Sequence, residues 1–286
     1  MRILNFQLNF GINLQQIKNP DSAELHSVPT KQKTKKIHTM GWKISLVIIE
    51  NNNKFSNDEL LLKKAGFRTI KKVDTVDFET ALGTKNKICI GNINDNIVIC
   101  DDYKLTEYFL SENNNLDLTE GEKNISSLFP NSEILAVACH SVSDFHAYSL
   151  IQKGKKTRLK IVSQEEKIEF GEKFEEENLL YKDAIKIEED LFWDLDNSKN
   201  EEDYYTESSL MEEFTFGIAK RRLGVELNLE EADEILKTNK FRVYDVDDYV
   251  EEIKRNNAKD KTWVRIIIYI IIFITIQLIN QFMKSK

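Results

Sequence analysis

The sequence is short of the residues on which most recognisable active sites depend. Its 286 residues include only 10 glycines, 3 prolines, 3 cysteines and 4 histidines. Phosphate-binding and dinucleotide-binding loops need glycine where the backbone approaches the ligand, and neither GxxxxGKS/T nor GxGxxG occurs. The HExxH, GxSxG and protein-kinase signatures are absent as well. We therefore expect no cofactor, and the sequence favours a non-catalytic protein over an enzyme.

An excess of positive charge is also lacking. The formal net charge is −8, which argues against nucleic acid as a partner. The three cysteines, Cys89, Cys100 and Cys139, lie in apolar contexts and show no CxxC spacing. They are typical of reduced thiols in the core of a cytosolic domain, and their spacing predicts no metal site.

Residues 1–39 differ from the rest of the chain. They hold two of the three prolines and carry six cations against two carboxylates, a net charge of +4. Polar residues interrupt every apolar run, so a signal peptide is not indicated. Because Met40 leads directly into an apolar strand, we expect residues 1–39 to be a disordered or wrongly assigned N-terminal extension, with Met40 as the true start.

The C-terminal segment Trp263–Phe282 is rich in isoleucine and reads WVRIIIYIIIFITIQLINQF. About 20 mainly apolar residues are enough for an α-helix to cross a bilayer. More lysine and arginine precede this segment than follow it, which places the N-terminal bulk in the cytoplasm. We expect a tail-anchored, single-pass membrane protein that contacts the lipid bilayer through this transmembrane helix, after a charged juxtamembrane helix over residues 246–262. The alternative is a soluble oligomer in which the same helix is buried.

Between these ends, residues 40–245 predict one cytosolic α+β domain. Apolar runs predict a first strand over Trp42–Glu50 and a central strand over Ile134–Cys139. Closely spaced hairpins make the sheet mainly antiparallel with flanking helices. One further strand is expected within 69–82, others over 88–90, 96–100, 145–152, 157–162 and 167–170, and an edge strand over Phe241–Tyr244.

Helix signals flank these strands. Ser56 and Ser209 each begin a capping-box pattern, and Gly66 and Gly224 stand where helices end. Short helices are expected over 104–110 and 228–236, whereas the Asn-rich segment 113–124 is predicted to be a polar loop.

The segment 172–205 is an acidic insertion that also contains Leu191, Phe192 and Trp193. Apolar side chains among carboxylates are typical of a segment that inserts into a protein partner. The alternative is a solvated insertion with a few residues folded back on the core.

One group of residues has the chemistry for catalysis. Cys139, His140, Asp144 and His146, with Ser141, supply a thiol, imidazoles, a hydroxyl and a carboxylate, as a nucleophilic or zinc site would need. Successive residues of a strand point to opposite faces, so Cys139 and His140 cannot face one another if the strand includes both. The alternative is a core cysteine followed by a polar strand end.

The stretches MGWKISLVII, QKGKKTRL, FGEKFEEE and AKRRLGVEL, with the CHS strand, resemble an uncharacterised group of bacterial proteins over Met40–Asn228. The resemblance implies no activity, cofactor or site residue. Together these observations predict a membrane-tethered, non-catalytic binding or regulatory protein. The alternatives are a membrane-associated hydrolase that uses Cys139 or His140, and the soluble oligomer.

Overall fold

The computed structural model describes residues 41–110 and 116–247. The expected N-terminal extension, the segment after Asp247 and the expected transmembrane helix lie outside these residues. Among the residues described, no helix is long and apolar enough to cross a membrane.

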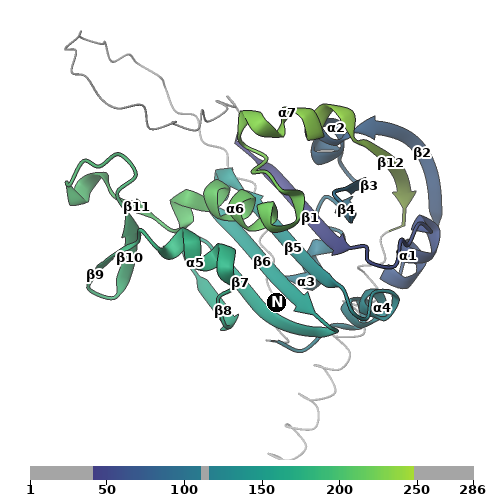
Figure 1. The fold of residues 1–286 in the computed structure, drawn as a ribbon, viewed down its shortest axis with the longest axis horizontal. Coiled ribbons are helices and arrows are strands. Elements are labelled where there is room, and N and C mark those ends of the chain that lie inside the picture. The colour runs from purple at the N-terminus through teal and green to yellow at the C-terminus, as the bar shows by residue number, and fades with distance from the viewer. Residues whose placement is uncertain (1–40, 111–115, 248–286) are drawn as a thin grey trace, which may run out of the picture. The chain divides into compact units, whose positions relative to one another are not determined.

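A nine-stranded sheet forms the centre of the domain, in the order β2-β12-β3-β4-β1-β5-β6-β7-β8 (Figure 1). Every neighbouring pair is antiparallel, and helices accompany the sheet, so the α+β prediction is confirmed. The strands are β1 (Lys43–Glu50), β2 (Ile70–Asp77), β3 (Ile88–Ile93), β4 (Asn96–Cys100), β5 (Glu133–His140), β6 (Phe145–Gln152), β7 (Lys155–Val162), β8 (Lys167–Gly171) and β12 (Lys240–Val246).

The sheet is buried on both faces, which explains the continuous apolar run of its middle strand. Along β1, Leu46 and Ile48 enter one hydrophobic core, while Val47 and Ile49 enter the other. Because successive side chains of a strand point to opposite faces, a strand covered on both sides must be apolar throughout.

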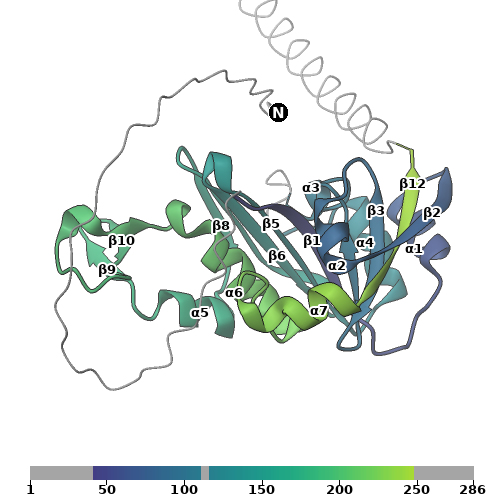
Figure 2. The same cartoon turned by 90° about the horizontal axis from the view of Figure 1, so that it is seen from above.

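Helices cover each face. Buried side chains of α2 (Phe78–Gly83), α6 (Met211–Leu223) and α7 (Asp233–Thr238) belong to the first core, and α5 (Glu175–Tyr181) packs against it. The second core is covered by α1 (Asp58–Ala65), α3 (Thr106–Phe109) and α4 (Glu120–Leu128). Figure 2 shows α6 and α7 along one side of the sheet and α3 on the other.

The acidic insertion folds into a small sheet of its own. Its strands are β9 (Ile185–Ile187), β10 (Asp190–Trp193) and β11 (Tyr205–Thr206), in the antiparallel order β11-β10-β9. We call residues 172–206, which comprise α5 and this sheet, the acidic arm.

Two predicted helix ends are confirmed and two predicted starts are wrong. Gly66 and Gly224 end α1 and α6 with φ values of 108° and 82°. The cap of α1 is Asn57, whose side chain accepts from the backbone of Leu60, and not Ser56. No side chain caps α6, because Ser209 lies in a 3₁₀ turn that runs directly into the helix.

Part of the predicted polar loop 113–124 is helical. Helix α4 begins at Glu120, and Thr119 and Glu122 form a complete capping box. This T-x-x-E pattern is the signal that the asparagine-rich composition obscured.

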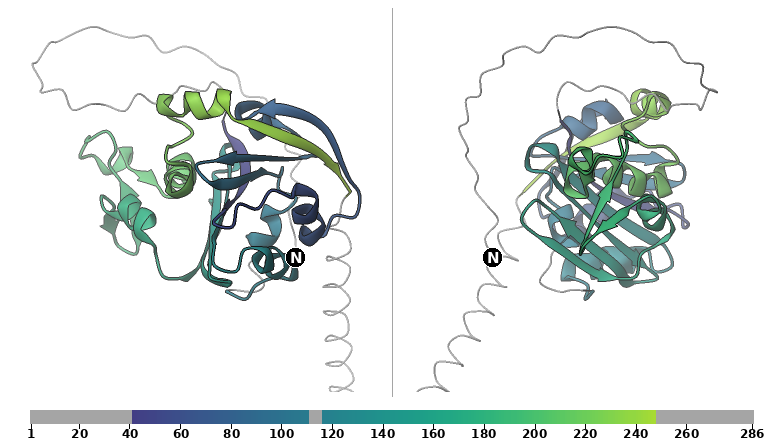
Figure 3. Two further views of the ribbon diagram at one scale, coloured as in Figure 1. Left: turned by 45° about the vertical axis from the view of Figure 1, so that its right-hand side comes forward. Right: turned by 90° about the vertical axis from the view of Figure 1, so that its left-hand side faces the viewer.

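The last strand, β12, is not at an edge as predicted. It pairs with β2 on one side and β3 on the other, and β2 is the edge strand, with exposed Lys71 and Lys72 (Figures 1 and 3). Lysines on an edge strand disfavour pairing with other chains. The error arose because chain order does not give the order of strands in a sheet.

A close backbone approach at Gly91 gives the first testable prediction. A β-carbon there would lie 2.5 Å from the ring of Phe241, which stacks on Phe78 at 4.7 Å. We expect Gly91→Ala to lower the free energy of unfolding by about 1–3 kcal/mol through overpacking. Urea unfolding of the full chain in a neutral detergent measures this.

The matched control is Gly121→Ala, since a β-carbon at this position of α4 meets nothing within 4 Å. Alanine favours the helix by about 0.5–1 kcal/mol, so this variant should be no less stable than the natural chain. Equal stability of the two variants would contradict the packing described at Gly91.

Candidate functional site

The four candidate residues lie at the β5–β6 connection but do not form one site. Cys139 and His146 are directly opposed across the two strands, and both are completely buried. His140 is the next residue of β5 and points to the other face, half-buried. Asp144 occupies a left-handed turn position with φ 43° and accepts a hydrogen bond from Gln164.

Burial makes Cys139 a poor nucleophile. Removal from water raises the pKa of its thiol to about 12, and the carboxylate of Glu212 adds to the effect of burial. The reactive form of cysteine is the thiolate, which is scarce at neutral pH when the pKa is that high. His140 lies beside the exposed polar residues of the turn, and its Nδ1 atom is 3.3 Å from the Ser143 hydroxyl.

A group of ionisable side chains that includes the buried His146 lies on the face of the sheet covered by α5 and α6. We call it the Glu207 cluster, and it consists of His146, Lys160, Lys167, Tyr181 and Glu207. Glu207 Oε1 lies 2.8 Å from the Lys160 ammonium and accepts a hydrogen bond of 2.6 Å from the Tyr181 hydroxyl. Its other oxygen lies 3.0 Å from Lys167 Nζ, and His146 Nε2 lies 3.5 Å from Oε1.

Electrostatics in this cluster favour a charged Glu207 and a neutral His146. Burial alone would raise the pKa of Glu207, but contacts with His146 and Lys160 outweigh it and hold that pKa well below its ordinary value. Burial lowers the pKa of His146, and the nearby Lys160 and Lys167 lower it further, although Glu207 acts in the opposite direction. The imidazole is also stacked on Phe214 at 5.0 Å.

A second group, the Arg158 cluster, adjoins the first and consists of Arg158, Glu169 and Glu177. The guanidinium of Arg158 donates to both oxygens of Glu177, at 3.0 and 2.5 Å, and to Glu169 at 2.9 Å. It also donates to the carbonyl of Gly171 at 2.8 Å. Glu177 belongs to α5, so this buried bidentate pair fixes α5 against the sheet.

A β-bulge directs a third cation of the same strand to the other face. Leu150 is opposite Arg158 and Ile151 is opposite Lys156, which leaves Thr157 without a partner in the register. The extra residue reverses the alternation, so Lys156 reaches Glu122 of α4 at 2.7 Å, with both side chains fully buried.

Two arginines in the last turn of α6 are neutralised by carboxylates. Arg221 and Arg222 both donate to Glu133 at 2.8 Å, and Arg222 also contacts Glu50 at 3.1 Å. Burial disfavours a charged Glu133, but hydrogen bonds from Arg221 and Gln152 outweigh it and hold its pKa below the ordinary value.

A surface pocket of about 490 Å³ opens beside these arginine pairs. Its lining includes Glu50, Glu133 and Arg222, whose charges are engaged with one another, and neither Cys139 nor His140 contributes to it. The part of the chain that the structure describes holds no group of three or more residues suited to a metal ion. Cys89 and Cys100 are opposed across β3 and β4 as free buried thiols.

The apolar residues of the acidic arm lie on two opposite faces of its small sheet. Leu191 and Trp193 pack toward the first core, and Trp193 meets Phe214 edge-on at 5.6 Å and donates to the carbonyl of Leu180 at 2.9 Å. Phe192 points to the opposite face of the small sheet, beside Ile185.

Sequence reasoning missed the buried charges of β7. The signal was present, because 156, 158 and 160 are all basic positions in a strand whose apolar neighbours demand burial. Their partners Glu122, Glu177 and Glu207 lie in three separate segments, and pairing at that sequence distance has no local signature.

No protein-family model, curated protein or solved structure matches this chain. The residues themselves are therefore the basis for any functional conclusion.

The Arg158 cluster gives a prediction about stability. Glu177→Gln leaves the guanidinium of Arg158 buried without its main counter-charge, and we expect a loss of about 3–5 kcal/mol in the free energy of unfolding. The double variant Arg158→Met/Glu177→Leu should recover much of this loss, because no charge is then stranded. Urea unfolding of the full chain measures both.

The control for this cycle is Lys63→Ala, which removes the exposed pair with Glu59. An exposed ion pair contributes about 0–1 kcal/mol, so little change is expected. A double variant no more stable than Glu177→Gln would show that the loss of stability does not come from the unpaired charge of Arg158.

His146 gives a prediction about pH. Its pKa is lowered by burial in the folded state, so the unfolded chain binds the proton more readily. The neutral imidazole therefore makes its full contribution to the free energy of unfolding above about pH 6.5. Below that pH the contribution decreases, by up to about 1.4 kcal/mol per pH unit. We expect His146→Phe, which keeps the stacking on Phe214, to flatten the stability profile between about pH 6.5 and pH 5.

The pH profile of His146→Phe must be compared with that of the natural chain, because folding changes the pKa values of other buried groups as well. The pKa values of Asp101 and Glu122 are raised by burial, so these groups act in the opposite direction as pH falls. An unchanged slope in His146→Phe would mean that His146 is not the proton acceptor in this range.

Proposed function

We propose that this chain is a membrane-tethered, non-catalytic binding protein, with its folded domain in the cytoplasm and its C-terminal helix in the bilayer. The observation that carries the tether is the isoleucine-rich segment Trp263–Phe282. An apolar stretch of that length is unfavourable in water and suited to a bilayer. The larger number of lysines and arginines before it supports the cytoplasmic placement of the domain.

A binding role is supported by how the domain uses its ionisable groups. Arg158, Lys160 and Lys156 are each buried against a carboxylate, and Cys139 is buried as a thiol. Groups engaged in this way hold the fold together and are not poised to attack a substrate. The acidic arm, in contrast, presents side chains to solvent.

The alternative of a hydrolase that uses Cys139 or His140 has less support. Cys139 and His146 are opposed, as a nucleophile and base would need to be, but both are enclosed in the core. The pocket of about 490 Å³ is lined by residues at the ends of β5 and β6 that lie farthest from Cys139 and His146. A cellular phenotype lost in Cys139→Ala or His140→Ala, with the protein still folded, would favour this alternative.

The tether is tested by membrane fractionation with alkaline carbonate extraction. We expect the full chain to remain in the membrane pellet and a truncation after Lys261 to be released, because only the former carries the apolar segment. A matched variant with Ile270→Lys and Ile272→Lys should also be released, since charges at the centre of a span are costly.

If the full chain is extracted by carbonate like the truncation, the proposed tether is wrong. The soluble oligomer then becomes the leading alternative, and sedimentation of the full chain against the truncation would measure its assembly.

A further inference from the structure

The small sheet of the acidic arm is covered on one face only. In the register of β9, β10 and β11, Phe192 is opposite both Ile185 and Thr206, while Trp193 is opposite Tyr205. Opposed residues of an antiparallel pair share a face, so the sheet has an inner face with Trp193 and an outer face with Phe192.

The inner face belongs to the core of the domain. Leu191, Trp193 and Tyr205 all contribute to or pack against the first core. Tyr181 of α5 also contacts Trp193, at 5.7 Å between ring centroids. The arm is therefore anchored, and its outer face is held in a defined position.

The outer face carries apolar side chains that lie outside both cores of the described residues. Ile185, Ile187 and Phe192 gather there, and none of them belongs to either core. Ile185 is 36% exposed, and Ile187 and Phe192 are half-buried. Three neighbouring large apolar residues on a short sheet are more than a scattered exposed side chain, and such patches mark binding surfaces.

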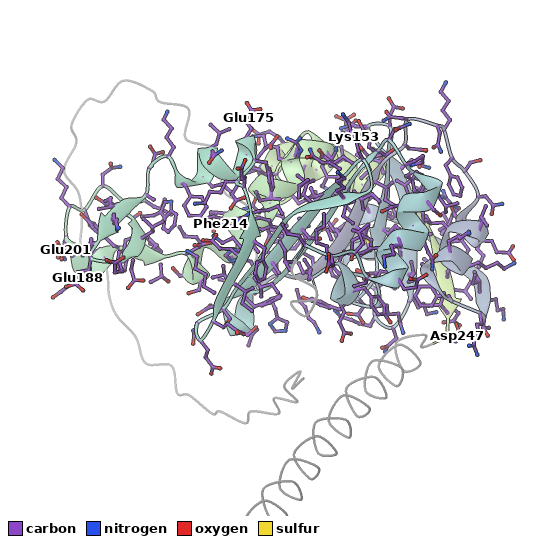
Figure 4. The ribbon with its side chains drawn as sticks, turned by 90° about the horizontal axis from the view of Figure 1, so that it is seen from below. Lys153, Glu175, Glu188, Glu201, Phe214 and Asp247 are labelled. Carbon is purple, nitrogen blue, oxygen red and sulfur yellow. The ribbon has the colours of Figure 1, made fainter. Side chains whose placement is uncertain are left out.

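The arm that carries this face has many carboxylates that are not neutralised. Residues 172–205 include thirteen Asp and Glu against four Lys, a net charge of −9 that exceeds the −8 of the whole chain. Glu188 and Glu201 lie together at the outer end of the arm, away from Phe214 (Figure 4). Seven carboxylates of the arm have no ion-pair or hydrogen-bond partner among the described side chains: Glu172, Glu175, Asp183, Glu188, Asp190, Glu201 and Glu202.

This charge restricts what can cover the outer face. In a second copy of the chain the same arm would bring its own net charge of −9 against the first arm, and anionic lipid would be repelled in the same way. A basic partner gains from the same field, both in attraction and in rate of association. The edge strand β9 has only three residues, which is too short to guide the addition of a partner strand.

We propose that the outer face of the small sheet docks a basic amphipathic helix of a partner protein, with Ile185, Ile187 and Phe192 against its apolar side and carboxylates of the arm, including Asp190 opposite Ile187, against its lysines or arginines. This inference rests on the proposed binding function and names the surface and the partner chemistry. Phe192 lies at the centre of the patch and is its main apolar anchor.

The test uses the full chain in a neutral detergent and three synthetic peptides. The first is a helix with leucine on one side and lysine on the other, the second has glutamate in place of lysine, and the third has the composition of the first in a non-amphipathic order. Binding is measured by fluorescence anisotropy of labelled peptide for the natural chain, Phe192→Ser, Ile185→Ser and Val142→Ser.

Val142 is the matched control, because it is 88% exposed but lies in the β5–β6 turn outside the arm. Binding of peptide to detergent is the same for all variants and cancels in the comparison. The difference in tryptophan fluorescence between each variant and the natural chain reports whether the arm stays folded, since Trp193 lies on the inner face and Trp42 and Trp263 lie outside the arm.

We expect the natural chain and Val142→Ser to bind the lysine peptide alike, and Phe192→Ser and Ile185→Ser to bind it at least about tenfold more weakly. The affinity should fall as salt is raised, and the glutamate and non-amphipathic peptides should bind at least about tenfold more weakly than the lysine peptide.

Three results would overturn the proposal. They are equal binding of the lysine peptide to Phe192→Ser and Val142→Ser, equal binding of the lysine and glutamate peptides, and no binding beyond that of empty detergent micelles. Displacement of the lysine peptide by a peptide of residues 1–39 at lower concentration would identify this chain, and not a partner, as the occupant. Carbonate extraction is independent of these results, so failure of the docking surface leaves the tether untouched, and failure of the tether leaves the docking surface untouched.

Discussion

The fold depends on the burial of three cations in one strand. Lys156, Arg158 and Lys160 of β7 are each nearly or fully inaccessible to water, and an unpaired charge in such a position would cost several kcal/mol. Each therefore needs a carboxylate, and the carboxylates come from α4, α5 and the turn before α6. That requirement constrains the positions of these three segments on the sheet, because displacement of a segment would leave a buried cation without its carboxylate.

The same pairs explain why a domain with many ionisable groups has little that resembles an active site. Glu207 and His146 both carry lowered pKa values, yet Glu207 connects Tyr181 of the acidic arm to Lys160 of the sheet, and His146 stacks on Phe214. Perturbed pKa values cluster at catalytic sites, but buried ion-pair networks perturb them as well. Here the core favours an ion-pair network, since His146 is fully buried beside Phe214 and away from the pocket at Glu133.

Much of the sheet could be predicted from the sequence, and little of the site. The run over Trp42–Glu50 and the tight Lys153–Gly154 hairpin are local signals, and both correspond to observed strands. The position of β12 and the pairing of Lys160 with Glu207 depend on contacts between distant segments, which no periodicity records. The bulge at Thr157 shows the limit most clearly, because one extra residue sends Lys156 to the opposite face from Arg158.

The proposed docking surface lies far along the sheet from β12, the last strand before the segment proposed as the tether. The described chain ends just after β12, beside the β2 edge, whereas the acidic arm follows β8 at the opposite edge. Seven strand spacings of about 4.8 Å separate β12 from β8, so the two lie about 34 Å apart along the sheet. The carboxylates of the arm that follows β8 are therefore separated from the end of β12 by more than the Debye length of about 8 Å at physiological ionic strength. Salt screens charges at that separation, so the acidic docking surface proposed on the arm is compatible with the tether proposed after β12.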